Sequence, residues 1–178
     1  MKILLAAIAL LVATNAAPVF AKGDANGKAA KSKKAASTPA IDPNVVVGKA
    51  HGGKVWIITS TAPSAEGEEL SKWLSAHPSA GEVTKKPKDE RWPITFLAVF
   101  KKPPAKGPMT IEFMDKKEPG TLVDQYSSET MGGSIVFQEP YDLDTNNGFN
   151  KDHTYLIKVG QIIKGKFIAY ATGEVSLK

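Results

Sequence analysis

Short runs rich in β-branched and aromatic residues, each ended by glycine, proline or a polar turn residue, fill most of the chain after residue 44. Antiparallel β-proteins show this spacing, because short turns join their neighbouring strands. The runs cover residues 45–48, 54–60, 94–100, 109–115, 121–129, 134–139, 154–163 and 166–177. They predict an all-β domain over residues 44–178, an antiparallel sandwich of about 7–8 strands.

Two glycine-bearing turns and one apolar run support the sandwich. Gly52-Gly53 and Lys164-Gly165 each separate two strand-like runs at the distance of a hairpin turn. Residues 94–100 are nearly all apolar, which predicts a strand that is covered on both faces.

One segment follows a helical rather than a strand pattern. Its apolar positions recur three and four residues apart, Ser64 is suited to cap its start and Pro78 ends it. The spaced residues are Leu70, Trp73, Leu74 and His77. They predict one short helix within residues 63–77, followed by a polar loop to about residue 90.

The end of the chain resembles the last strands of immunoglobulin-like domains in secreted bacterial proteins. The similar features are Gly148-Phe149, the strand opening at residues 153–156 and the terminal hairpin. The cysteine pair of antibody domains is absent, since the chain has no cysteine. The resemblance implies an immunoglobulin-like β-sandwich, and no functional residue follows from it.

Residues 1–21 have the pattern of a cleavable signal peptide. Lys2 precedes an apolar run over residues 3–12, and Val19-Phe20-Ala21 matches the small-residue rule for cleavage after Ala21. An uncleaved anchor is the alternative, but the run is about half the roughly 20 residues that span a bilayer. Without cysteine, neither lipid attachment at the cut nor a disulfide is open to the chain. We expect a periplasmic or secreted protein.

Residues 22–43 form a lysine- and alanine-rich segment without aromatic residues, which predicts a disordered linker. It contributes to the formal net charge of +5. A solubilising spacer is one interpretation, and peripheral contact with an anionic envelope surface is the other. The lysines concerned are Lys22, Lys28, Lys31, Lys33 and Lys34.

Oxygen-bearing side chains alternate near residue 144 in a way that resembles the start of a calcium loop. An EF-hand loop requires glycine at its sixth position and glutamate at its twelfth, where this chain has Asn147 and His153. The candidate ligands of a different calcium site are Asp142, Asp144, Asn146 and Asp152. The alternative is a polar loop with a turn at Asn147-Gly148. No other cofactor is predicted.

No catalytic motif is present in the sequence. His51, His77 and His153 lie in separate segments, and no Gly-x-Ser-x-Gly motif supplies a nucleophile. Glu68 and Glu69 are adjacent on the predicted helix and point apart, unlike a glycosidase pair. These observations predict a protein that is not an enzyme.

Trp92, between Arg91 and Pro93 at a strand entrance, is the tryptophan that we expect to be partly exposed and able to bind a ligand. The leading hypothesis is a non-enzymatic binding or interaction module of the bacterial cell envelope, with an envelope protein or polysaccharide as partner and no nucleic acid. The alternatives are a polysaccharide-binding module that uses Trp92 and a hydrolase with a dispersed active site.

Overall fold

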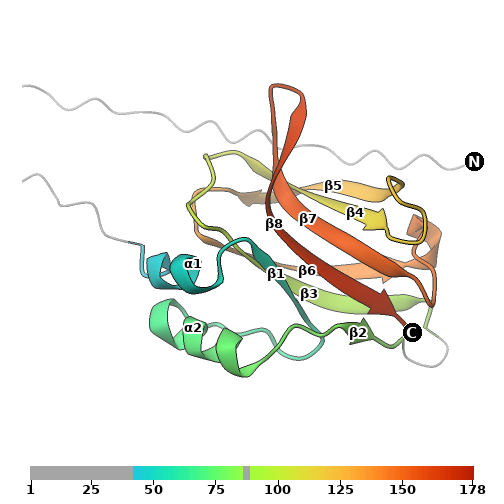
Figure 1. Cartoon of the computed structure of the whole chain (residues 1–178), viewed down its shortest axis with the longest axis horizontal. Helices are drawn as coiled ribbons and strands as arrows, with labels where there is room; N and C mark the ends of the chain where they lie inside the picture. Colours follow the sequence, from blue (N-terminus) through green and yellow to red (C-terminus); the bar gives the residue numbers. More distant parts are fainter. Residues whose placement is uncertain (1–41, 86–88) are drawn as a thin grey trace, which may run out of the picture. The chain divides into compact units, whose positions relative to one another are not determined.

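Strands make up most of the structure, a computed structural model that describes residues 42–85 and 89–178 (Figure 1). The elements in chain order are α1 (Val45–His51), β1 (Lys54–Ile58), α2 (Gly67–Ala76), β2 (Glu82–Val83), β3 (Arg91–Val99), β4 (Pro108–Asp115), β5 (Leu122–Met131), β6 (Val136–Asp144), the 3-10 helix η1 (Thr145–Asn147), β7 (Thr154–Ile163) and β8 (Lys166–Leu177). The predicted all-β character is confirmed in this coarse sense. The predicted leader and residues 22–41 of the predicted linker lie outside the described residues and stay predictions.

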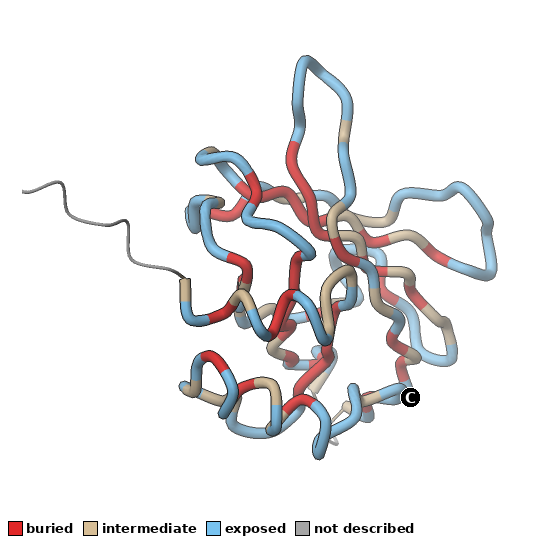
Figure 2. Tube along the Cα trace, turned by 60° about the vertical axis from the view of Figure 1, so that its left-hand side comes forward, coloured by how far each residue is buried: buried red, intermediate tan, exposed pale blue. Residues whose placement is uncertain are grey.

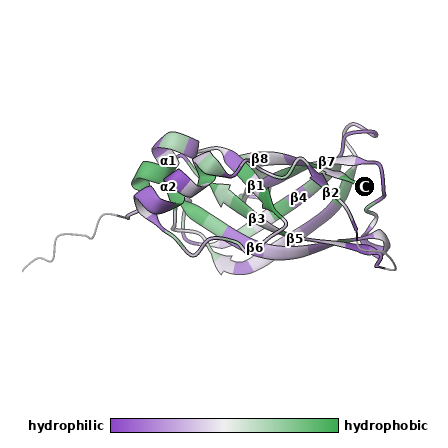
Figure 3. Cartoon of the chain, turned by 90° about the horizontal axis from the view of Figure 1, so that it is seen from below, coloured by the Kyte–Doolittle hydropathy of each residue, from purple (hydrophilic) through white to green (hydrophobic). Residues whose placement is uncertain are grey.

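All the strands of the described residues belong to one hydrogen-bonded sheet. Its strand order is β5-β4-β7-β8-β1-β3-β6, with β2 paired to β8. β8 runs parallel to β1 and β2, while the other neighbours are antiparallel. The sheet is therefore mixed, and it curls into a half-barrel (Figures 1 and 3). The separate two-sheet, immunoglobulin-like sandwich is not confirmed, because the described strands form a single sheet. The alternation of residues in a sequence does not say which strands pair.

The curled sheet encloses the main hydrophobic core. Alternate side chains of its strands point to this core, as the pleat of a strand requires. The largest side chains there are Trp92, Phe96, Phe113, Phe149 and Tyr155, all fully buried. Burial of apolar surface on this scale stabilises a fold that has no disulfide.

A second apolar cluster lies on the opposite face of β1 and β3, where α1 and α2 cover the sheet. The buried members of this cluster are Val47, Trp56, Ile58, Leu70, Leu74, Leu97, Val99 and Ile135. The prediction that residues 94–100 are covered on both faces is confirmed. The cover on one face is a pair of helices, not a second sheet.

The helix predicted within residues 63–77 is confirmed as α2, which spans Gly67–Ala76. Glu66 rather than Ser64 occupies the N-cap position, and it makes no capping hydrogen bond through its side chain. The predicted polar loop after this helix contains β2, which adds to β8 in parallel.

The strand predicted over residues 45–48 is wrong, because these residues begin α1. Val47 is fully buried, and Gly48 lies so close to β3 that an added Cβ would be 2.8 Å from the carbonyl oxygen of Phe100. Tertiary packing thus overrides the β-propensity of the valines. Neither helix of residues 42–85 is long and apolar enough to cross a membrane, and residues 89–178 contain none that is.

The two ends of the sheet, β5 and β6, meet through side chains. The Tyr141 hydroxyl donates a hydrogen bond to Asp124, and the Ser128 hydroxyl donates one to Glu139. The rings of Tyr126 and Tyr141 stack with their centroids 4.8 Å apart. We call this contact the seam. It brings together the two strands that stand at opposite ends of the pairing order.

Candidate binding cleft

A cleft of about 660 Å³ lies where the segment after β3 meets the base of the β7–β8 hairpin. This volume is within the range of small-molecule binding sites. Its wall combines aromatic rings, prolines and lysines, among them Phe100, Lys101, Lys102, Pro103, Pro104 and Tyr170.

A β-bulge directs Tyr170 into the cleft. Val159 pairs with Ala171 and the next residue, Gly160, pairs with Ala169, so Tyr170 is the extra residue of β8. Bulges of this kind turn a side chain away from the regular alternation of its strand. Gly160 is required here, because a Cβ at this position would be 2.0 Å from the carbonyl oxygen of Ile168.

Contacts beneath the cleft hold the tyrosine and the neighbouring loop in place. The Tyr170 hydroxyl donates to Oε1 of Gln161 at 3.2 Å, and its ring packs edge-on against Phe100 with centroids 6.0 Å apart. Gln161 is buried, and its Nε2 donates to the carbonyl oxygens of Ala105 at 2.8 Å and Gly107 at 3.3 Å. The hairpin and the loop after β3 therefore form one ordered wall.

Two lysines are among the residues that line the cleft. Lys101 and Lys102 are exposed, and neither forms an ion pair with another described residue. The adjacent Pro103-Pro104 restricts the backbone, because the proline ring fixes φ. A cleft lined by an aromatic ring and two lysines suits a ligand that has both an anionic group and a flat apolar face.

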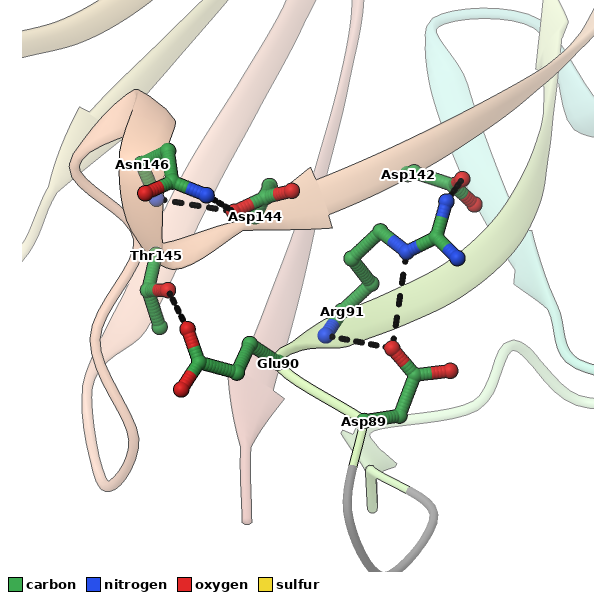
Figure 4. Close-up of polar contacts among 7 residues, drawn as sticks. All are labelled: Asp89, Glu90, Arg91, Asp142, Asp144, Thr145 and Asn146. Carbon is green, nitrogen blue, oxygen red and sulfur yellow. Dashed lines mark hydrogen bonds and ion pairs between the residues drawn. The ribbon is translucent and has the colours of Figure 1, made fainter.

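Three of the four residues predicted to bind calcium, Asp142, Asp144 and Asn146, do not converge on one point (Figure 4). Oδ1 of Asp144 accepts hydrogen bonds from the backbone N–H of Asn146 at 2.8 Å and from its side-chain amide at 2.9 Å, which caps η1. Oδ2 of Asp142 lies 3.2 Å from Nη1 of Arg91. The alternative interpretation is a polar loop with a turn at Asn147-Gly148. The turn is confirmed, since Gly148 has a φ of 88°.

Asp152, the fourth predicted ligand, faces a different partner. Its Oδ1 lies 3.8 Å from Nζ of Lys178, at the C-terminal end of β8. Over residues 42–85 and 89–178, no group of three or more histidine or acidic side chains is arranged to hold a metal ion. Calcium binding at these residues stays a prediction without support from their geometry.

The expectation that Trp92 is partly exposed is wrong. Its side chain is completely buried in the main core, and its Nε1 donates to the carbonyl oxygen of Lys178 at 3.0 Å. Nζ of Lys85 lies 5.5 Å from the ring centroid. A ring covered on all sides offers no face to a saccharide, so the cleft replaces Trp92 as the candidate binding site.

The three histidines have separate local partners. Nε2 of His51 lies 3.1 Å from Oγ of Ser71 on α2, and His77 stacks on Trp73. Nδ1 of His153 lies 2.6 Å from Oδ2 of the buried Asp115. A histidine oriented by a buried carboxylate is part of many acid-base sites, but it needs a reacting partner to become one.

Sequence reasoning did not assign Tyr170, Gln161 or the lysine pair to a site. Tyr170 alternates with its neighbours like an ordinary strand residue, and a bulge depends on the pairing of two strands. The signals available were the run Lys101-Lys102-Pro103-Pro104 and a glycine inside a strand-like run, which often marks a bulge.

No family model, no curated protein and no solved structure matches the chain.

Proposed function

We propose that the protein is an exported, non-enzymatic binding module of a bacterial cell envelope whose cleft binds an acidic saccharide. The observation that carries this proposal is that Tyr170, the extra residue of a bulge, lines the same cleft as Lys101 and Lys102. Aromatic rings stack on sugar faces, and ammonium groups attract carboxylates or phosphates.

A saccharide fits this site better than an envelope protein does. The cleft holds about 660 Å³, within the roughly 300–1,000 Å³ typical of sites for small molecules. The non-enzymatic role is proposed from the sequence, which contains neither a nucleophile motif nor a facing pair of carboxylates.

Calorimetric titration of the full chain with an acidic oligogalacturonate and with neutral maltohexaose tests the binding proposal. We expect measurable binding of the acidic sugar by the wild type. The double variant Lys101→Ala/Lys102→Ala should bind this sugar at least about tenfold more weakly. Tyr170→Leu should weaken binding at unchanged charge. Added salt should weaken the wild type more than the lysine variant, because salt screens exposed charges.

The matched control is Lys151→Ala, an exposed lysine near the start of β7 and so at the opposite end of that strand from the cleft. Each variant retains residues 22–43, so a difference in affinity belongs to the cleft. Equal affinity of the wild type and the double variant would refute the site. Release of shorter sugars during the titration would refute the non-enzymatic role.

Export is tested by the mature N-terminus. We expect the chain recovered from the envelope fraction of expressing bacteria to begin at Lys22, as cleavage after Ala21 requires. A chain that retains Met1 and stays in the cytoplasm contradicts the proposed location.

A further inference from the structure

The end of the β7–β8 hairpin projects beyond the rest of the sheet as a two-stranded ribbon (Figures 1 and 2). β4 pairs with β7 only as far as Gly160, and β1 pairs with β8 at Thr172. Beyond these points, β7 and β8 pair only with each other, from Gln161 opposite Ile168 to Ile163 opposite Lys166. We call residues 162–168 the tip; Gln161, at its base, is buried and bonded to the loop after β3.

Both faces of the tip carry apolar side chains. Ile162 pairs with Phe167 and these two side chains share one face. Ile163 and Ile168 lie on the other face, because they belong to the neighbouring pairs of the ladder. A ribbon that packed against its own protein would bury one of these faces.

The isoleucines of the tip are instead exposed to solvent. The exposed fractions are 51% for Ile162, 42% for Ile163 and 43% for Ile168. They account for half of the large hydrophobic residues that are exposed in the described residues, the others being Val46, Leu122 and Met131. Apolar surface gathered on one projection indicates a site of interaction.

Two lysines accompany the isoleucines. Lys164 lies in the closing turn, where it and Gly165 have φ values of 51° and 75°, as a tight two-residue turn requires. Lys166 follows the turn on the second strand. Both are exposed, and among the described residues neither takes part in an ion pair. The tip is therefore apolar on both faces and cationic.

We propose that the tip inserts into the surface of an anionic lipid bilayer. A bilayer surrounds an inserted ribbon and so covers both of its faces, whereas a flat protein surface would cover only one. At headgroup level the isoleucines reach the acyl boundary, and the flexible lysine side chains extend to the lipid phosphates. The docking does not depend on a sugar in the cleft.

Sedimentation of the mature chain, which begins at Lys22, with vesicles tests this docking. The vesicles contain either phosphatidylcholine alone or roughly three parts phosphatidylcholine to one part phosphatidylglycerol. The informative variant is Ile162→Ser/Ile168→Ser, which leaves every lysine of the chain in place. We expect the wild type to bind the anionic vesicles, and the affinity to fall about tenfold for each isoleucine replaced.

The matched control is Leu122→Ser, which removes a side chain that is 47% exposed. Leu122 pairs with Met114, and Met114 pairs in turn with Leu156 near the start of β7. Leu122 therefore lies near the end of β7 that is opposite the tip. This variant should sediment like the wild type. The variant Lys164→Glu/Lys166→Glu should show a smaller preference for anionic over neutral vesicles than the wild type, because the tip no longer carries positive charge.

Three outcomes would overturn the lipid docking. The first is unchanged sedimentation of the double serine variant, which would assign membrane contact to the lysines of the chain alone. The second is failure of the wild type to bind either vesicle. The third is a dimer in solution that the serine variant disperses while lipid binding stays the same, which would identify the tip as a contact between copies. Titration of the same variants with the acidic sugar measures the affinity of the cleft independently of lipid binding.

Discussion

At the scale of single residues, Asp115 is an ionisable group whose surroundings shift its pKa. Its side chain is buried, and it accepts hydrogen bonds from the backbone N–H of Lys117 at 2.8 Å and from Nδ1 of His153 when that atom carries the proton. Burial by itself raises the pKa of Asp115. The hydrogen bonds from His153 and Lys117, together with their positive charge, outweigh burial and hold this pKa below its ordinary value of 3.8.

A lowered carboxylate pKa links this residue to acid stability. The contribution of Asp115 to the free energy of unfolding is complete above its ordinary pKa of 3.8, and it is lost as the pH falls through the lower pKa of the folded state. Asp115→Asn should therefore lower the free energy of unfolding by about 1–3 kcal/mol at neutral pH. The difference from wild type should shrink below pH 3.8. Urea unfolding from neutral pH to about pH 2 measures it.

Glu174→Gln is the matched control for this change. Glu174 pairs with Lys116 at 2.8 Å, but both side chains are about half exposed. An exposed pair contributes about 0–1 kcal/mol, and salt screens it. A cost in Glu174→Gln equal to that in Asp115→Asn would contradict the special role of the buried carboxylate.

At the scale of elements, the bulge between β7 and β8 connects backbone geometry to the cleft. Gly160→Ala places a Cβ against the carbonyl of Ile168, so the strands must separate or the bulge must shift. We expect a loss of about 1–3 kcal/mol in the free energy of unfolding. The same shift moves Tyr170, so binding of the acidic oligosaccharide should weaken as well. Thermal unfolding and the sugar titration measure the two effects.

Gly81→Ala is the control for this element. An added Cβ at Gly81 meets no atom within 4 Å, and its backbone is outside the left-handed region. We expect a change within about 0.5 kcal/mol. If Gly160→Ala were equally neutral, the close approach at the bulge would not be what places Tyr170.

At the scale of the whole molecule, the seam between β5 and β6 joins the two end strands of the curled sheet through side chains. These strands follow each other in the chain, yet they stand at opposite ends of the pairing order. Tyr141 stacks on Phe113 and Tyr126, and its hydroxyl reaches Asp124. Burial raises the pKa of Tyr141, and the Asp124 carboxylate raises it further, so its hydroxyl stays a hydrogen-bond donor at neutral pH.

Two tyrosine variants separate hydrogen bonding from stacking at the seam. Tyr141→Phe keeps the ring but removes the donor to Asp124, and should cost about 1–2 kcal/mol in the free energy of unfolding. Tyr126→Phe removes a buried hydroxyl that lies near the Glu139 carboxylate without a well-oriented hydrogen bond, and should cost less than Tyr141→Phe. Chemical unfolding compares them. Equal losses in the two variants would show that the hydroxyl of Tyr141 contributes no more than that of Tyr126.

Prediction from the sequence succeeded where the information is local and failed where it depends on pairing. The strand over 154–163, the closing turn at Lys164-Gly165 and the helix after Pro63 follow from residue spacing. The position of Trp92 between Arg91 and Pro93 at a strand entrance predicts partial exposure, but its ring is buried in the core and its Nε1 donates to the carbonyl oxygen of Lys178. A contact between residues as far apart in the chain as 92 and 178 cannot be predicted from the residues next to either one.

The sequence by itself determined that residues 44–178 form a mostly β structure, because strand propensity, alternation and turn chemistry act within a few neighbouring residues. Only the tertiary structure decided that these strands form one curled, mixed sheet rather than two packed sheets. It also placed helix α1 where valines favour a strand, and it directed Tyr170 into the cleft. These features depend on which distant segments exclude water together, and burial rather than local propensity selects that arrangement.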